Sequence, residues 1–330
     1  MKRDRVLAFA HDGIVLTGPE VVSWYLDGVR TTVPFSGASV LAVLVSPEGD
    51  TVRCFANERA RLAAESGLVD VEAVPWDASL TTDWQAFPTE LEFEAELRAA
   101  RASLLPAELG RYRALAREVA ALTTEVGLRA RPRDTELAIA ARLVERVVAI
   151  GAEPTVVLVA GDARLGYRHP LPTGAELGQR ALLVVGARRH GMVVSLTRWL
   201  DFGRAQREVD ARIAEVEADV LDATRVGRSV GDVFRDLEGA YARHGFGADE
   251  SRNHHQGGAT GYFGRDPRAT ADREELVVEN HAFAWNPSAP LTKVEDTVIA
   301  TSAGIEVLTV DENWPTNLVR GRQRPAPLNP

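Results

Sequence analysis

The stretch that most constrains the fold is residues 254–295, where two histidines and a glycine-rich run precede several apolar segments. It begins HHQGGATGYFGRDP and ends LVVENHAFAWNPSAPLTKVE. Gly257, Gly258 and Gly261 permit backbone conformations and close approaches that a Cβ forbids. The apolar runs LVV and AFAW, and TVIA just beyond, indicate strands of a buried sheet. The stretch therefore predicts a sheet that carries polar side chains beside a histidine-bearing bend, an arrangement that suits the wall of an active site.

Length and charge limit the classes of function that fit this chain. Its 330 residues and 45% hydrophobic content allow two domains with full cores. A formal net charge of -9 argues against a nucleic-acid partner, because binding phosphates requires a basic face. No apolar run approaches the roughly 20 residues of a membrane span, and the first apolar segment is too short for a secretory signal. We therefore expect a cytoplasmic protein with neither a nucleic-acid nor a membrane partner.

The single cysteine, Cys54, excludes an intrachain disulfide and suits a reducing compartment. It lies in VRCFA, whose alternation is typical of a strand. This pattern favours a buried structural thiol over a nucleophile.

The first half of the chain predicts a small α/β domain followed by linking helices. VLAFA and GIVLTG have the apolar pattern of strands, GPEVVSWYLDG that of a short helix, and SVLAVLVSPEGDTVRCFA that of a hairpin. Residues 86–130 are rich in Ala, Leu, Glu and Arg, and Pro106 divides them into two helices. The expected domains are residues 1–105 and 106–330.

The second half predicts one curved, largely antiparallel sheet with helices on its convex face. It runs from the strand TVVLVAG through the loop GYRHPLPTGAEL to the strands RALLVVGAR and GMVVSLTRWLDFG, and then through two helices to residues 254–295. The concave face of such a sheet is the natural place for a pocket.

This half resembles the pita-bread fold of the creatinase, prolidase and aminopeptidase P superfamily. The resemblance rests on His169 and Pro172 in the loop, the strand pair LLVVGARRHGMVVSLTRW, two helices, the glycine-rich motif, and the final VEDTVIATSAGIEVLT, all in the family's order. It implies an α/β (α+β) chain with a C-terminal pita-bread domain and a smaller N-terminal creatinase-like domain. It also implies a homodimer in which the partner's N-terminal domain lies near the site.

The resemblance does not extend to the family's metal ligands. Members with two metal ions hold them with two aspartates, one histidine and two glutamates, which suit hard or borderline divalent ions. In register with those motifs, the five positions are occupied by Val184, Ser195, Gly258, Asn286 and Glu295. A single carboxylate cannot hold a dinuclear centre, so we expect no metal and no cofactor.

Polar residues nevertheless remain along the former metal site. His169 and His254 fall where the family carries substrate-facing histidines, and creatinase is a member that works without metal through a histidine acid/base. A histidine with a near-neutral pKa can shuttle a proton at physiological pH. The expected catalytic residues are His254, His255, His169 and Glu295. The expected substrate-binding residues are Arg198, Arg265, Asp266, Asn286, Ser195 and Tyr262.

These residues divide by charge. Arg198 and Arg265 suit the anionic end of a zwitterion, because a guanidinium grips a carboxylate with two parallel hydrogen bonds. Asp266 and Glu295 suit the cationic end. Glu295 can instead form a structural ion pair with Lys293 or Arg265.

The expected function is metal-independent hydrolysis of a C–N bond in a small, polar, zwitterionic substrate such as an amidine, an amide or an Xaa-Pro-like compound. Elimination or another proton transfer needs the same residues and stays open. A binding module that has lost catalysis also stays open. A fourth possibility is a residual metallo-aminopeptidase, if the register of the glycine-rich motif shifts so that His255 reaches a metal.

Overall fold

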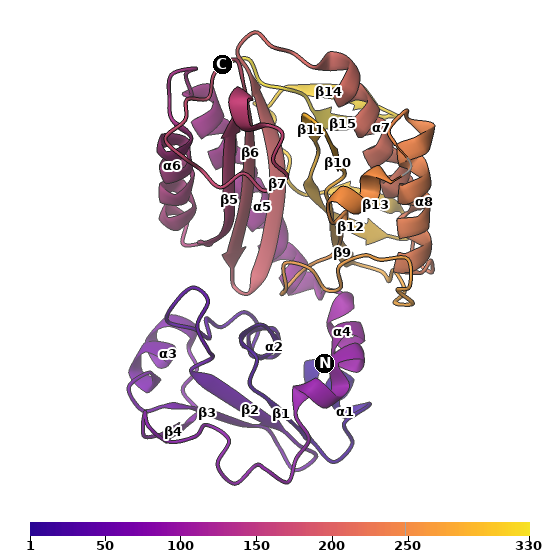
Figure 1. Cartoon of the computed structure of the whole chain (residues 1–330). Helices are drawn as coiled ribbons and strands as arrows, with labels where there is room; N and C mark the ends of the chain where they lie inside the picture. The colour runs from indigo at the N-terminus through magenta and orange to yellow at the C-terminus, as the bar shows by residue number, and fades with distance from the viewer. Residues whose placement is uncertain (248) are drawn as a thin grey trace. The chain divides into compact units, whose positions relative to one another are not determined.

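A computed structural model describes residues 1–247 and 249–330, which form two compact units (Figure 1). The first comprises Met1–Ala102 with His190–Met192, and the second comprises Ser103–Arg189 with Val193–Pro330. The division therefore falls within the helical region of residues 86–130. Within the described ranges, no helix combines the length and the apolar character that crossing a bilayer requires.

The first unit is built on a four-stranded sheet in the order β1-β2-β3-β4. The first three strands pair antiparallel, and β4 runs parallel to β3. Cys54 in β3 is fully buried, as expected for a structural thiol. The elements of this unit are α1 (Lys2–Leu7), β1 (Ile14–Leu16), α2 (Pro19–Tyr25), β2 (Leu41–Val45), β3 (Thr51–Phe55), α3 (Arg59–Ser66), β4 (Glu72–Val74), η1 (Glu90–Phe93) and α4 (Glu94–Ala102).

The start of the chain corrects one prediction. VLAFA was expected to be a strand, but helix α1 includes its first two residues and a turn follows. Lys2 and Val6 are buried, and their spacing of four places them on one face of α1. Lys2 belongs to this face because its Nζ reaches Asp27 Oδ1 at 2.6 Å. A buried lysine with a distant partner leaves no signal in the local pattern.

Three helices of the second unit begin at residues that favour a helix start. Pro106 is the first residue of α5 (Pro106–Leu128), where its missing N–H costs nothing. Thr135 caps α6 (Glu136–Ala149), and its hydroxyl accepts from Ala138 N at 3.2 Å. Ser229 caps α8 (Val230–Arg243) in the same way. The long helix α7 (Arg207–Ala223) packs beside α8, as Figure 1 shows.

The strands of the second unit form the predicted curved, largely antiparallel sheet covered by helices. One part is the three-stranded sheet β5-β6-β7 and the other has the order β13-β12-β9-β8. They meet where Thr197 N donates to Glu295 O and Ser195 N donates to Thr297 Oγ1, both at 2.9 Å. The strands are β5 (Glu153–Gly161), β6 (Arg180–Arg189), β7 (Met192–Asp201), β8 (Gly257–Ala259), β9 (His281–Trp285), β12 (Asp296–Thr301) and β13 (Gly304–Val307).

The remaining elements are two short hairpins and two single turns. The hairpins are β10 (Ser288–Ala289) with β11 (Thr292–Lys293) and β14 (Thr316–Val319) with β15 (Arg322–Pro325). The turns are η2 (Asp162–Arg164) and η3 (Glu250–Asn253).

Apolar packing and a buried charge network hold α7 and α8 against this sheet. Val220 and Leu237 of the helices share one core cluster with Phe283 and Val298 of β9 and β12. Burying such side chains stabilises the fold by about 1.5–3 kcal/mol each. The helices are therefore fixed relative to the strands that carry the site.

The charge network links β15 to α7, β12 and β7. Arg324 Nε donates to Glu217 Oε2 at 2.7 Å, and its Nη2 donates to Asp296 Oδ2 at 2.5 Å. Asp296 also accepts from Arg198 Nη2 at 2.9 Å. All four side chains are at most 4% exposed. Charges this deeply buried are stable only while each keeps its partner.

Candidate functional site

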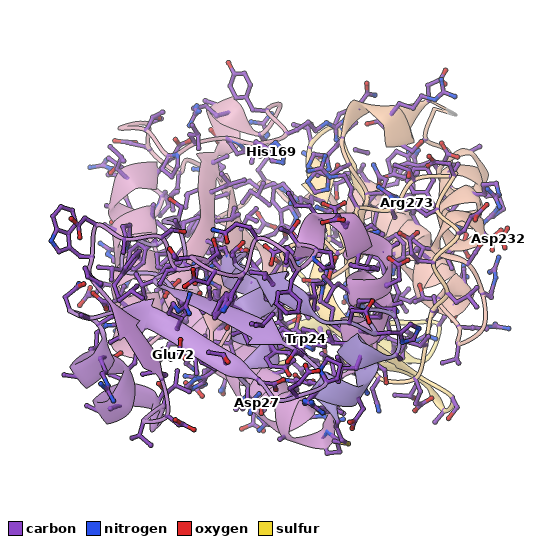
Figure 2. All side chains as sticks on the ribbon, turned by 90° about the horizontal axis from the view of Figure 1, so that it is seen from below. Trp24, Asp27, Glu72, His169, Asp232 and Arg273 are labelled. Carbon is purple, nitrogen blue, oxygen red and sulfur yellow. The ribbon has the colours of Figure 1, made fainter. Side chains whose placement is uncertain are left out.

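Three histidines from distant parts of the sequence meet in the second unit. One ring nitrogen from each of His169, His254 and His255 lies within 4.8 Å of the others, and we call this group the histidine cluster. The Nε2 atoms of His169 and His254 are 2.9 Å apart, and the rings of His254 and His255 stack with centroids 4.4 Å apart. His169 is exposed, His254 is buried and His255 is intermediate. Figure 2 labels His169 among the side chains. The cluster thus has one side open to solvent.

Contacts of neighbouring residues hold the two segments that supply the cluster. Arg168, next to His169, forms an ion pair with Glu250 of η3 and donates to Ser288 Oγ at 3.3 Å. Gln256, next to His255, donates to the carbonyl oxygen of His254 at 2.6 Å. These contacts position the loop after η2 and the residues before β8 relative to one another.

The glycines after the cluster have the role that the sequence predicts. Gly257 has φ +96°, and a Cβ there would lie 2.1 Å from Ala284 O. Gly258 has φ +139°, and its Cβ would lie 2.5 Å from Pro267 O. Both positions therefore require glycine, because β8 approaches the neighbouring backbone too closely for a side chain.

The imidazoles of the cluster are neutral at pH 7. Burial is the main cause that lowers the pKa of His254 to about 3, and the charge of Lys293 adds to it. Burial, with Arg265 and Arg268, lowers the pKa of His255 to about 4. The pKa of His169 is also lowered, first by burial and then by Lys293. The pKa values of His254 and His255 therefore lie well below the near-neutral value expected from the sequence. Each neutral ring keeps a lone pair that can accept a proton or bind a metal.

Glu295 is the one carboxylate among the five family ligand positions, and the chain's own cations hold it. Its Oε1 accepts from Arg265 Nη2 at 2.8 Å, and its Oε2 lies 3.1 Å from Lys293 Nζ. Thr197 Oγ1 donates to the same Oε2 at 3.0 Å. Burial would raise the pKa of Glu295, but Lys293 and Arg265 outweigh it and lower the pKa to about 2. Glu295 therefore forms the structural ion pair that the sequence left open, with Lys293 and Arg265 both as partners.

The dinuclear metal centre of the family does not fit these residues. Val184 is 4% exposed in an apolar cluster with Leu182 and Trp199, and Gly258 has no side chain. Asn286 is 2% exposed, and its Oδ1 finds no hydrogen-bond partner in the described part of the chain. Since Glu295 is already paired with Lys293 and Arg265, these five positions offer no set of carboxylates for two ions.

The expected substrate-binding residues lie in different surroundings. Arg265 lies near the cluster. Its charge helps to lower the pKa of His255, and its guanidinium forms an ion pair with Glu295. Asn286 N donates to the carbonyl oxygen of Gln256 at 3.0 Å, so Asn286 lies beside the segment that contains His255. Ser195 is partly buried on β7, where its backbone contacts Thr297 Oγ1.

The other three residues serve different contacts. The guanidinium of Arg198 donates to Asp296 at 2.9 Å and to the carbonyl oxygens of Thr197 and Thr309. Its expected role in holding a substrate anion is therefore corrected to a structural one. Tyr262 Oη donates to Glu108 Oε1 at 2.8 Å, and the charge of Asp266 acts on His281.

Lys293 and Arg268 act on the histidines although they were not chosen as site residues. Lys293 could have been identified from the sequence. It stands two positions before Glu295, and residues i and i+2 of a strand share a face. Arg268 gave none, since it reaches the cluster only through the fold of residues 254–269.

His281 lies outside the cluster and titrates as a buried core residue. It begins β9 and is 3% exposed. Burial lowers its pKa to about 4, against a smaller opposing effect of Asp266. The unfolded chain, with an ordinary histidine pKa near 6.5, binds the proton first as the pH falls. The free energy of unfolding therefore decreases between about pH 6.5 and pH 4.

The substitution His281→Phe should remove part of this acid sensitivity. We expect the loss in unfolding free energy between pH 7 and pH 5 to be smaller by about 2 kcal/mol than in the wild type. Urea denaturation at the two pH values measures it. Ile139→Val, a change at a fully buried position of α6 without a titrating group, should keep the wild-type difference. An unchanged difference in His281→Phe would contradict the assignment.

Comparisons with known proteins identify the fold. No family model matches this sequence, and no curated protein matches it. Among solved structures, the prolidase from Pyrococcus horikoshii OT3 is similar with a TM-score of 0.78 at 16% identity, over 94% of this chain and 98% of that one. The X-Pro aminopeptidase from Thermotoga maritima MSB8 gives 0.75 at 17% identity, over 95% and 99%. The N-terminal domain of FACT complex subunit SPT16 from Cicer arietinum (chickpea) gives 0.69 at 10% identity, over 94% and 93%. The fold common to these structures is the one that the sequence resemblance implied.

Proposed function

Starting from this pita-bread fold, we propose that the chain is a hydrolase that cleaves a C–N bond in a small polar substrate at the histidine cluster, without a dinuclear metal centre. The observation that carries the proposal is the convergence of three neutral imidazoles beside Lys293 and Arg265. Solved structures of the same fold include a prolidase and an X-Pro aminopeptidase, whose names describe C–N hydrolysis.

The pair of His169 and His254 supports activation of water. With their Nε2 atoms 2.9 Å apart, one ring donates a hydrogen bond and the other accepts it. The ring that keeps a free lone pair can take a proton from water as the oxygen attacks carbon. Because His169 is exposed, the proton can then pass to solvent or to the leaving nitrogen.

The positive side chains favour the developing negative charge of the reaction. An imidazole with a low pKa is a weak base, so the reaction depends on stabilising the oxyanion that forms at the attacked carbon. Lys293, Arg265 and Arg268 each act electrostatically on the cluster, whereas the charge of Glu295 opposes them there. The same field favours a substrate with a carboxylate near the scissile bond.

The proposal is tested with a panel of Xaa-Pro dipeptides, simple amides and creatine-like amidines. The double variant His254→Ala/His255→Ala should reduce kcat by roughly 100-fold or more on any substrate that the wild type cleaves. His11→Ala, at an exposed site in the first unit, is the matched control and should keep wild-type turnover. Circular dichroism verifies that both variants fold.

Product analysis separates the alternatives. Uptake of one oxygen from labelled water supports hydrolysis, while an unsaturated product would show elimination instead. Undiminished turnover in the double variant would remove the histidines from the mechanism. Binding of a panel compound without turnover would favour the binding module.

A further inference from the structure

We propose that the histidine cluster binds one transition-metal ion of the zinc class through ring nitrogens of His169, His254 and His255. This mononuclear site differs in residues and in number of ions from the dinuclear centre of the fold family. The inference concerns the same cluster as the proposed function and goes beyond it, because a ring nitrogen that binds the ion no longer accepts a proton. Its test measures binding, so either proposal can fail alone.

The spacing of the three rings suits a single ion. A Zn–N bond is about 2.0–2.1 Å long, so two nitrogens on one tetrahedral ion lie about 3.3 Å apart. The candidate nitrogens are all within 4.8 Å of one another, and the Nε2 atoms of His169 and His254 are 2.9 Å apart. His169 sits on a loop and is exposed, so small side-chain rotations can bring the three donors to bonding distance.

The state of the donors suits a metal as well. Metal binding uses neutral imidazole, through a ring nitrogen that carries no proton. Within residues 1–247 and 249–330, Nδ1 of His254 and Nδ1 of His255 are buried without a hydrogen-bond partner. A buried polar nitrogen without a partner costs free energy. A metal ion bound at such a nitrogen would give it a partner.

The charges around the cluster select among metals. Lys293, Arg265 and Arg268 repel any cation, and Glu295 attracts it while already paired. Mg²⁺ and Ca²⁺ require oxygen ligands and gain little from three imidazoles. Zn²⁺, Co²⁺, Ni²⁺ and Cu²⁺ bond strongly to imidazole nitrogen and can overcome the repulsion. The exposed side at His169 leaves room for a further ligand, and the positive surroundings favour an anion there.

The test uses full-length protein without a polyhistidine tag, because a tag binds the same ions. The protein is treated with a chelator, the chelator is removed, and Zn²⁺ is added during calorimetry at pH 7. A parallel titration with Co²⁺ follows the visible absorption, which reports nitrogen ligands and coordination number. We expect one equivalent of Zn²⁺ or Co²⁺ per chain, and no heat signal with Mg²⁺.

Variants identify the ligands. His169→Gln and His255→Gln should each weaken Zn²⁺ binding by at least roughly 10-fold and abolish or shift the Co²⁺ absorption. His169→Gln changes an exposed side chain, so it keeps the fold if His255→Gln does not. His11→Gln is the control and should bind like the wild type.

Two results would overturn the inference. One is a wild type that binds neither ion, and the other is wild-type affinity in both His169→Gln and His255→Gln. Turnover without metal binding would overturn this inference and leave the hydrolase proposal intact. Metal binding without turnover of the panel would support the site and count against the hydrolase.

Discussion

Replacing Arg324 by Met should reduce the free energy of unfolding by about 3–5 kcal/mol, because it leaves two buried carboxylates without their shared cation. Glu217 and Asp296 are each 2% exposed and accept hydrogen bonds from this guanidinium. Asp296 keeps Arg198, whereas Glu217 loses the cation that bonds to it directly. Urea denaturation at pH 7 measures the difference in unfolding free energy, with one dependence on urea concentration fitted to both proteins.

Two further variants separate the loss of charge from the loss of packing. Arg322→Met lies two residues earlier on β15, where Arg322 pairs with the half-buried Asp222, and should cost less than about 1 kcal/mol. Adding Glu217→Gln to Arg324→Met should recover part of the stability, since the orphaned charge is removed. Equal losses for Arg322→Met and Arg324→Met would refute the role of the network.

The substitution Glu295→Gln should also destabilise the chain by about 3–5 kcal/mol at pH 7. It leaves the ammonium of Lys293, whose side chain is 7% exposed, and the guanidinium of Arg265 without their anion. Because the pKa of Glu295 is lowered to about 2, its contribution is complete above about pH 4.5. The difference between wild type and variant should therefore shrink as the pH falls from about 4.5 toward 2. Denaturation curves across this range measure it.

Glu306→Gln is the matched control for this experiment. Glu306 pairs with Arg113 through two hydrogen bonds of 2.7 and 2.8 Å, but both side chains are more than a third exposed. Water screens such a pair, so the control should lose at most about 1 kcal/mol. The double variant Glu295→Gln/Lys293→Met should be more stable than Glu295→Gln alone. A double variant that is less stable would mean that Lys293 contributes by packing more than by charge.

Local signals in the sequence were sufficient for most elements of the second unit. Pro106 marks a helix start through its own side chain, and the apolar runs mark β6 and β7. These signals depend on residues within one or two turns, so a single sequence contains them. The segment VLAFA failed because its helical face includes Lys2, whose partner Asp27 lies 25 residues away.

The site was predictable in composition but not in arrangement. The residues around His254 were identifiable because histidines and glycines gather in one short stretch. That His169 contacts His254 follows from the fold resemblance, since 85 residues separate them. The lowered pKa values of these rings could not be foreseen, because burial and the charges of Lys293 and Arg265 are properties of the assembled unit. The structural role of Arg198 depends likewise on Asp296, which lies 98 residues away.

The residues at the positions matched to two-metal ligands limit the mutational paths open to this chain. An aspartate at Val184 would place a carboxylate in an apolar cluster, at a cost of several kcal/mol unless a partner arrives with it. Any side chain at Gly258 meets the backbone of residues 267–269. An ion that approached Glu295 would have to displace Lys293 and Arg265. Each single step toward a two-metal centre therefore lowers stability before any ion can bind, so new chemistry on this scaffold is more accessible through the histidines than through such a centre.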